Sequence, residues 1–187
     1  MKHFTFIVFF TFITFTSSAQ CKYLVNETDA FTGTSKLETY PVLVYNFQKR
    51  LDLRFIKLDD ERYLFAHLTI PASDIVFVQG NEMILLFNDD STHKLTLSGD
   101  HGKDISAGTT SNVGGMLHSQ FGLYYHFSED DRNILQDKQL KGVRFYGAET
   151  YVEIPVAQTA AQWGGAGKNK KEAALMSFFS KDVQCVF

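Results

Sequence analysis

The stretch LDLRFIKLDDERYLFAHLTIPASDIVFVQGNEMILLFNDDSTHKLTL, residues 51–97, decides the fold of this chain. Starting at Leu64, every second residue up to Ile70 is apolar, and this period of two predicts a β-strand. Met83–Phe87 is apolar throughout, which predicts a strand buried on both sides. Turn-forming residues separate these runs, so the stretch predicts three or four consecutive antiparallel strands.

Two further strands complete this stretch. Ile75–Val78 is a short β-branched and aromatic run, and the Gly80-Asn81 pair that follows suits a two-residue hairpin turn. After a polar turn at residues 88–91, side chains alternate again from residue 92 to residue 98, with His93 on the apolar face. Because the connecting loops are short, we expect neighbouring strands to pair as an antiparallel meander.

The rest of the chain adds more strands and two helices. Ser128, followed by three acidic residues, predicts the start of a helix that ends near Lys141-Gly142. A second helix is predicted close to the end of the chain, with Phe178 and Phe179 on its apolar face. Further strands are expected at residues 21–24, 31–40, 42–45, 121–127, 143–146 and 150–154. We therefore predict an α+β fold, predominantly antiparallel β, with about 8–10 strands in a sandwich or strongly bent sheet and two short helices.

Composition limits the class of protein. The 187 residues correspond to one domain, and an apolar content of 44% is enough to build a core. The formal net charge of −3 argues against nucleic acid as a partner, because nucleic-acid-binding proteins present a basic face.

The first 19 residues have the features of a secretory signal peptide. Lys2 and His3 precede an apolar stretch, and Ser17-Ser18-Ala19 supplies the small residues of a cleavage site. The alternative, a membrane anchor, is too short, because a spanning helix needs about 20 apolar residues. We therefore expect one β-rich domain over residues 20–187, without an integral membrane segment after signal removal, exported to the periplasm or the extracellular space.

Cys21 and Cys185 are the two cysteines of the chain. In an exported protein such a pair predicts a disulfide that ties the two ends together, and the alternative is two unpaired thiols. Gln20 directly before Cys21 does not fit a lipobox, which argues against lipid anchoring.

Two segments resemble a group of known proteins. The sequence CKYLVNETDAFTG at residues 21–33, and a short helix followed by a Val-Arg-Phe strand within residues 128–145, resemble small exported proteins of unknown function from Bacteroidetes-type bacteria. The resemblance implies export and a β-rich domain, and it implies no catalytic residues.

A glycine-rich segment, Gly99–Gln120, interrupts the strand pattern. Loops of this length in a compact domain are functional or mobile, although part of this one could hide a strand near Val113. His93, His101 and His118 lie in or next to it, and imidazole is a zinc ligand. These histidines are a candidate metal site, and the alternative is that they are exposed or packed against the sheet.

Tyrosines and the single tryptophan offer a second candidate site. Tyr124, Tyr146 and Trp163 are predicted to form an aromatic face for a ligand, whereas the alternative is that such side chains belong to the core. Gly164–Lys168 departs from the phosphate-loop pattern and reads as a linker. The acid pairs at Asp59-Asp60 and Asp89-Asp90 lie in predicted turns, where carboxylates bond to local backbone.

These features favour a binding protein over an enzyme. We expect a non-enzymatic module at the cell envelope that binds a small ligand, a glycan or an envelope protein, without a cofactor. The alternative is an exported, metal-assisted hydrolase that uses the histidines around Gly99–Gln120.

Overall fold

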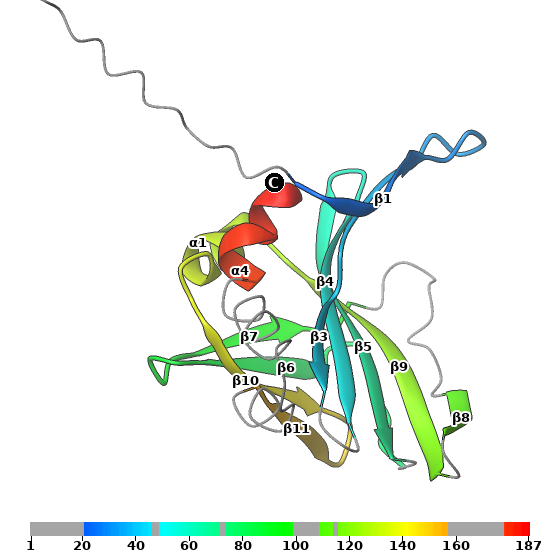
Figure 1. The fold of residues 1–187 in the computed structure, drawn as a ribbon, viewed down its shortest axis with the longest axis vertical. Helices are drawn as coiled ribbons and strands as arrows, with labels where there is room; N and C mark the ends of the chain where they lie inside the picture. Colours follow the sequence, from blue (N-terminus) through cyan, green and yellow to red (C-terminus); the bar gives the residue numbers. More distant parts are fainter. Residues whose placement is uncertain (1–20, 46–48, 72–73, 99–108, 114–115, 157–177) are drawn as a thin grey trace, which may run out of the picture.

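Two antiparallel β-sheets form the body of the protein in the computed structural model, which describes residues 21–45, 49–71, 74–98, 109–113, 116–156 and 178–187 (Figure 1). The larger sheet has seven strands in the order β1-β2-β4-β5-β9-β8, and β3 also pairs with β4. The smaller sheet has four strands in the order β11-β10-β6-β7. The strands are β1 (Tyr23–Thr28), β2 (Ser35–Thr39), β3 (Val42–Tyr45), β4 (Arg50–Leu58), β5 (Glu61–Pro71), β6 (Glu82–Phe87), β7 (Thr92–Thr96), β8 (Thr109–Val113), β9 (Met116–His126), β10 (Leu140–Tyr146) and β11 (Tyr151–Pro155).

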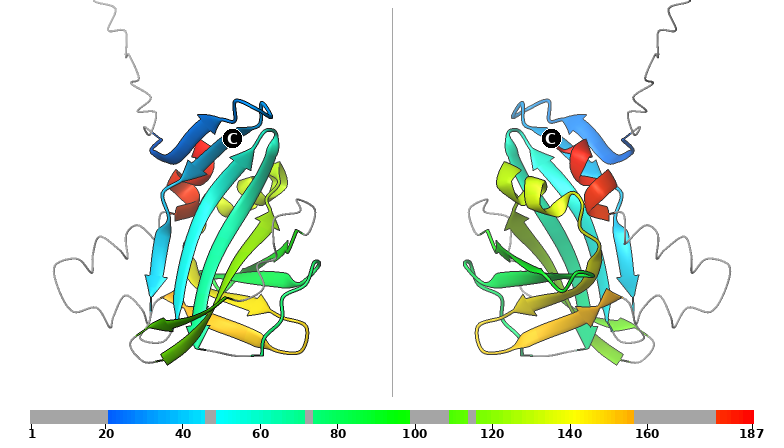
Figure 2. Two further views of the ribbon diagram at one scale, coloured as in Figure 1. Left: turned by 90° about the vertical axis from the view of Figure 1, so that its right-hand side faces the viewer. Right: turned by 90° about the vertical axis from the view of Figure 1, so that its left-hand side faces the viewer.

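The core lies between the two sheets. The strands of the small sheet cross those of the large sheet at a steep angle (Figure 1), and β4 and β5 form one side of the molecule with the small sheet behind them (Figure 2). Alternate residues of both sheets point into one apolar cluster, which confirms the predicted β-rich α+β class. The sheets meet where Leu97 pairs with Tyr125 and the Ser98 N–H donates to the Tyr124 carbonyl oxygen at 2.8 Å.

Short helices close one end of this core. Helix α1 (Glu129–Leu135) begins at Ser128 with a capping box, as the sequence predicts. Helix α4 (Phe178–Lys181) and the 3₁₀ turn η1 (Val183–Cys185) follow near the end of the chain. The Phe178 ring stacks on Phe55 of β4 with 4.8 Å between centroids, so α4 fixes the C-terminal segment to the large sheet.

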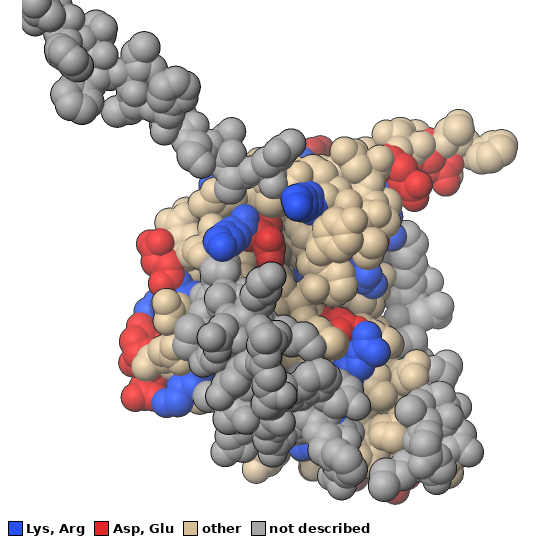
Figure 3. Space-filling view, in the orientation of Figure 1, with Lys and Arg blue, Asp and Glu red and all other residues tan. Residues whose placement is uncertain are grey.

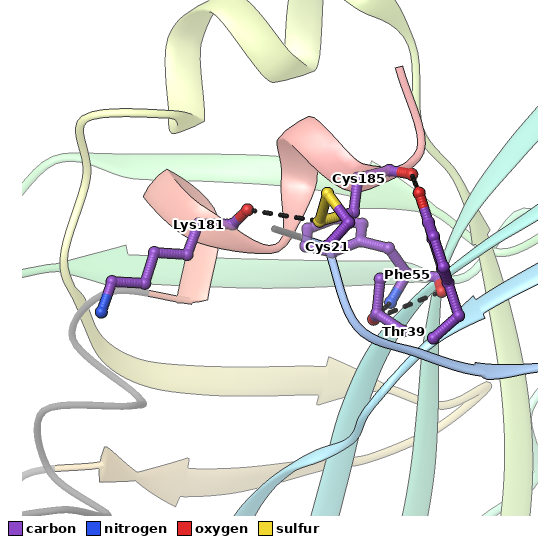
Figure 4. Close-up of a disulfide and its surroundings, with 6 residues drawn as sticks. Cys21, Thr39, Phe55, Lys181 and Cys185 are labelled. Carbon is purple, nitrogen blue, oxygen red and sulfur yellow. Dashed lines mark hydrogen bonds between the residues drawn. A yellow bond between two sulfur atoms is a disulfide. The ribbon is translucent and has the colours of Figure 1, made fainter. Parts of the chain in front are cut away.

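A disulfide joins Cys21 to Cys185, with 5.5 Å between their Cα atoms, and this confirms the predicted pairing (Figure 4). The Tyr23 hydroxyl donates to the Cys185 carbonyl oxygen at 2.9 Å. Beneath the disulfide, the Phe55 N–H donates to the Thr39 hydroxyl at 3.0 Å. The first strand and the C-terminal turn are therefore held together by one covalent bond and one hydrogen bond.

Several predictions about the stretch 51–97 were wrong in detail. It forms two hairpins, β4–β5 and β6–β7, but they belong to different sheets, so they are not one meander. Ile75–Val78 is not a strand: Ile75 and Phe77 are buried, yet this segment pairs with no strand. Its backbone accepts hydrogen bonds from the Ala148 N–H at the Val76 carbonyl and from the Asn81 N–H at the Val78 carbonyl. Strand β6 is buried on one face only.

Other elements were misplaced as well. Residues 109–113 and 116–120, expected in a long glycine-rich loop, lie in β8 and β9. Helix α1 ends at Leu135, and Lys141-Gly142 lies inside β10. The strand expected at residues 31–40 begins at Ser35, because Asp29–Thr34 forms a tight turn.

Parts of the predictions fall outside the described residues, namely the signal peptide, the segment 99–108 with His101, and the segment 157–177 with Trp163. No helix within the described ranges is long and apolar enough to span a membrane.

Candidate functional site

A shallow pocket lies on the outer face of the four-stranded sheet, the face that points away from the core. It encloses about 510 Å³, part of it open to solvent. Cross-strand pairing explains how it forms, because Ile84 and Leu86 of β6 stand opposite Arg144 and Gly142 of β10. Arg144 in turn stands opposite Glu153 of β11. Among the residues that the structure describes, those lining it are Ile84, Leu86, Thr92, Gly142, Val143, Arg144 and Glu153.

Gly142 leaves part of this space free. Other positions on the same face of β10 carry side chains, whereas Gly142 has no side chain that could cover the sheet. A Cβ built at Gly142 would lie 3.6 Å from the Ile154 carbonyl oxygen and 4.0 Å from the Leu86 Cδ2 atom, which are ordinary contact distances. Neighbouring atoms therefore leave room for a side chain at this position. Because glycine has none, the free space becomes part of the pocket.

Arg144 is the centre of a polar cluster at the rim. Its Nε and Nη2 atoms donate to Glu153 Oε2 at 3.1 and 2.7 Å, and Nη1 donates to the Tyr146 hydroxyl at 3.3 Å. Its guanidinium carbon also lies 4.8 Å from the centre of the Tyr151 ring. The hydrogen bonds to Tyr146 and Glu153 raise the pKa of Arg144 above its ordinary value, so the rim keeps a fixed ion pair of zero net charge.

The predicted aromatic face is divided between the two sheets. Tyr146 lies on the outer face of the small sheet, 5.9 Å from Tyr151 between ring centroids. Tyr124 lies instead on the outer face of the large sheet, where its ring packs against Phe65 at 4.6 Å. Burial raises the pKa of the Tyr124 hydroxyl. The structure therefore does not bring Tyr124 and Tyr146 together, and Trp163 lies outside the described residues.

The outer face of the large sheet carries ion pairs whose carboxylates are almost covered. The Glu38 carboxylate contacts Arg54 Nη1 at 3.0 Å and Lys36 Nζ at 3.2 Å, and the Arg54 guanidinium lies over the Phe65 ring. Asp52 accepts from Arg50 Nη2 at 3.0 Å.

The pKa of Asp52 reflects two opposing effects. Burial raises it, but hydrogen bonds from His67 and Arg50 outweigh burial, so the pKa lies below its ordinary value. Each of these carboxylates already has cationic partners within the protein. This face is therefore a weaker candidate for a ligand-binding site.

The histidines of the predicted metal site are placed apart. His93 Nε2 lies 2.6 Å from Asp131 Oδ1 at the start of α1, which follows the end of β9. His118 lies near the start of β9, an eleven-residue strand that spans roughly 35 Å. Among the described residues no group of three His, Cys, Asp or Glu side chains could hold a metal ion. His101 lies outside these residues, so a metal site that includes it stays a prediction.

Ser128, Asp131 and His93 form a hydrogen-bonded chain that differs from a hydrolytic triad. In a triad the histidine lies between the serine and the carboxylate and takes the serine proton. Here Asp131 lies in the middle: the Ser128 hydroxyl donates to Asp131 Oδ2 at 2.5 Å, and His93 contacts the other carboxylate oxygen. Burial raises the pKa of Asp131, yet the bonds from Ser128 and His93 hold it below its ordinary value. The arrangement caps α1, and His93 contacts Asp131 rather than the serine hydroxyl.

Sequence reasoning missed most of the pocket. It assigned Met83–Phe87 to a strand buried on both sides, whereas Ile84 and Leu86 face outward and line the pocket. A signal was present, because a hairpin about Gly147-Ala148 places Arg144 opposite Glu153 and Tyr146 opposite Tyr151 by counting. Gly142 gave no such signal, because the sequence was interpreted as placing it at the end of a helix rather than inside β10.

No family model matches the sequence, and no curated protein or solved structure matches it. The resemblance of residues 21–33 and 128–145 to small exported proteins therefore stays a prediction, and any functional argument has to come from the site itself.

Proposed function

We propose that this chain is a non-enzymatic, exported binding module whose ligand occupies the pocket on the outer face of the four-stranded sheet. The observation that carries the proposal is the combination of an apolar floor and a neutral polar rim. Ile84 and Leu86 supply the floor, and the Arg144–Glu153 pair supplies both donors and acceptors at its edge. Binding pockets commonly combine apolar lining with a few polar groups that fix orientation.

The chemistry of the rim favours a neutral ligand with hydroxyl groups. An ionised ligand would gain little attraction, because the charges of Arg144 and Glu153 already neutralise each other. A sugar ring has one face of C–H groups for the floor and hydroxyls that can both donate to Glu153 and accept from Arg144. A glycan of the cell envelope is therefore the ligand class that we propose.

Two features support the location of this activity outside the cytoplasm. The Cys21–Cys185 disulfide is compatible with export, because disulfides persist in oxidising compartments. The predicted signal peptide at residues 1–19 agrees with it.

The proposal is tested by following backbone amide signals by NMR while single sugars are added. The probes are glucose, galactose, mannose and N-acetylglucosamine, and the β-linked dimers of glucose and N-acetylglucosamine. We expect at least one of them to shift amide signals of β6, β10 and β11 at millimolar concentration.

Variants then assign the binding to the pocket. Gly142→Val fills the space beside Leu86 and should abolish the shifts. Thr96→Val is the matched control, because it introduces the same side chain at an exposed position of the same sheet outside the pocket lining. The absence of any shift with all six sugars, or binding that Gly142→Val leaves intact, would contradict the proposal.

A further inference from the structure

The β1–β2 hairpin projects from the body of the molecule (Figure 1). Its strands pair out to Thr28 and Ser35, beyond the end of β4 at Leu58. Phe31 stands at the tip of this hairpin with 100% of its surface exposed. Phenylalanine prefers the interior, and a fully exposed ring on a projection loses all the free energy that burial would provide.

The turn that presents Phe31 is held by a network of hydrogen bonds around Asp29. One carboxylate oxygen, Asp29 Oδ1, accepts from the backbone N–H groups of Phe31 at 2.7 Å and Thr32 at 3.0 Å. The Asp29 backbone donates to the Thr34 carbonyl and accepts from the Gly33 N–H. Gly33 has a φ of +74°, which side chains rarely tolerate. The hydrogen bonds to Phe31 and Thr32 lower the pKa of Asp29, so it stays ionised in this role at neutral pH.

The base of the hairpin is fixed as well. Ser35 and Asp59 exchange two hydrogen bonds, from the Ser35 N–H to Asp59 Oδ1 at 2.7 Å and from the Asp59 N–H to the Ser35 carbonyl at 2.9 Å. The disulfide of Cys21 holds the chain two residues before β1 begins. The ring is therefore presented from an ordered arm rather than from a loose loop.

The surroundings of the ring are acidic. Between residues 26 and 36 the hairpin has two acids, Glu27 and Asp29, and one base, Lys36, which stands opposite Glu27. The neighbouring β4–β5 turn contributes Asp59 and Asp60, so acidic side chains outnumber basic ones around the hairpin. Figure 3 shows acidic side chains on the hairpin directly behind its uncharged tip. An anionic membrane surface would be repelled by these groups, whereas a protein surface with basic residues would be attracted.

We propose that the β1–β2 hairpin is a docking element that inserts Phe31 into an apolar pocket of another protein, one whose rim is lined by Lys or Arg. This inference does not depend on the sugar-binding pocket, because the hairpin belongs to the other sheet. Buried aromatic side chains provide much of the binding energy of protein interfaces. A pre-ordered turn also reduces the conformational entropy that is lost on binding.

The test has two stages. First, a benzoyl-phenylalanine photo-crosslinker replaces Phe31 in the full chain, and irradiation is carried out in the envelope of the cells that export it. The same group at Ile134, which is 50% exposed on α1, is the matched control. A polypeptide that crosslinks from residue 31 and not from residue 134 is then identified and purified, and its binding to the protein is titrated by calorimetry.

Phe31→Ala should weaken this binding by at least about 30-fold, as expected of a central aromatic contact. Phe31→Leu should recover part of it. The double variant Glu27→Gln with Asp29→Asn keeps the Oδ1 acceptor of the turn but removes two charges, so it should reduce affinity several-fold and flatten its dependence on salt. The control for charge is Asp130→Asn with Glu149→Gln, two exposed acids elsewhere, which should leave affinity unchanged.

Four outcomes would overturn the proposal. They are the absence of a crosslink specific to residue 31, binding that Phe31→Ala does not weaken, self-association in sedimentation that Phe31→Ala abolishes, and Phe31-dependent binding to vesicles of phosphatidylcholine with or without phosphatidylglycerol. The third would assign the hairpin to a second copy of this chain, and the fourth to a lipid surface. Circular dichroism and the melting temperature of each variant verify that the hairpin substitutions leave the fold intact.

Discussion

The outer faces of the two sheets differ in how far their paired carboxylates are exposed to solvent. On the large sheet, Glu38 is only 4% exposed and Asp52 9% exposed, and both carboxylates contact cationic partners. On the small sheet, the side chains of Arg144 and Glu153 are 40% and 49% exposed beside an open pocket.

We interpret the outer face of the large sheet as one that stabilises the fold, and that of the small sheet as the one with the candidate site. Charges that are buried together cannot exchange partners without a large loss of free energy, so they hold strands in register. Exposed paired charges beside a pocket can hydrogen-bond to a ligand at little cost, because water already competes for them. Substitutions of charged residues on the two faces should therefore differ in their effect on stability.

The largest effect is expected from the buried carboxylate of the large sheet. Glu38→Ala leaves Arg54 without its buried partner and should lower the free energy of unfolding by about 3 kcal/mol. Glu153→Ala, the equivalent deletion on the small sheet, should cost less than about 1 kcal/mol. Urea denaturation of both variants measures the difference, and equal losses would remove the contrast between the faces.

A smaller effect is expected at Asp52, and it depends on pH. Asp52→Asn removes the charge that His67 and Arg50 contact and should cost about 1 kcal/mol at pH 7. Because the folded pKa of Asp52 is lowered, its contribution is present above the unfolded pKa of about 4 and is lost as the pH falls further.

The difference in stability between wild type and the Asp52→Asn variant should therefore become smaller between pH 7 and pH 3. Glu82→Gln, in the exposed pair with Lys94 on the small sheet, should change stability little at either pH. A difference in stability between wild type and Asp52→Asn that stays constant from pH 7 to pH 3 would show that the charge of Asp52 does not cause it.

A third comparison concerns two tyrosine hydroxyls, that of Tyr125 in the core between the sheets and that of Tyr23 beside the disulfide. The Tyr125 hydroxyl is buried and has no hydrogen-bond partner in the described part of the chain, and burial raises its pKa far above the ordinary value. Tyr125→Phe should therefore stabilise the protein by about 1 kcal/mol. Tyr23→Phe, which removes a hydroxyl bonded to Cys185, should destabilise it by a similar amount. A loss of stability in Tyr125→Phe would contradict the assignment of an unpaired hydroxyl.

The smallest change in stability is expected at Gly142. Gly142→Ala adds a methyl group at ordinary contact distances and should alter the free energy of unfolding by less than about 0.5 kcal/mol. Gly147→Ala is the matched control, because its Cβ would lie 2.7 Å from Ile75 Cγ1 and 2.9 Å from the Val76 carbonyl oxygen. Thermal melting of the two variants should differ clearly, and a large loss at Gly142 would mean that the pocket is needed for folding.

The sequence was informative where a local pattern determines the structure. Alternation in residues 64–70 predicted β5, and Ser128 with its acidic neighbours predicted the start of α1. The strands expected at residues 143–146 and 150–154 correspond to β10 and β11. In each case the signal and the structure lie within a few residues of each other.

Features that depend on distant contacts were not predictable in this way. Periodicity does not say which sheet a strand joins, so the crossing from β5 to β6 was missed. Ile84 and Leu86 are apolar because they line a surface pocket, and a run of apolar residues looks the same when it is buried on both sides. Of the residues named from the sequence, Tyr146 hydrogen-bonds to Arg144 beside the pocket, and its role in ligand binding stays a prediction. The floor and the ion pair of the candidate site follow only from the register of the sheet.

The disulfide has a mechanical consequence. A pulling force applied to the two ends of the chain passes directly from Cys21 to Cys185, which are 164 positions apart in the sequence. The folded residues between them bear none of that tension. In a single-molecule pulling experiment the oxidised protein should extend only by the residues that lie outside the Cys21–Cys185 loop, whereas reduction should release about 550 Å of contour length. The bond thus protects both sheets, and the sites on them, against unravelling from either end.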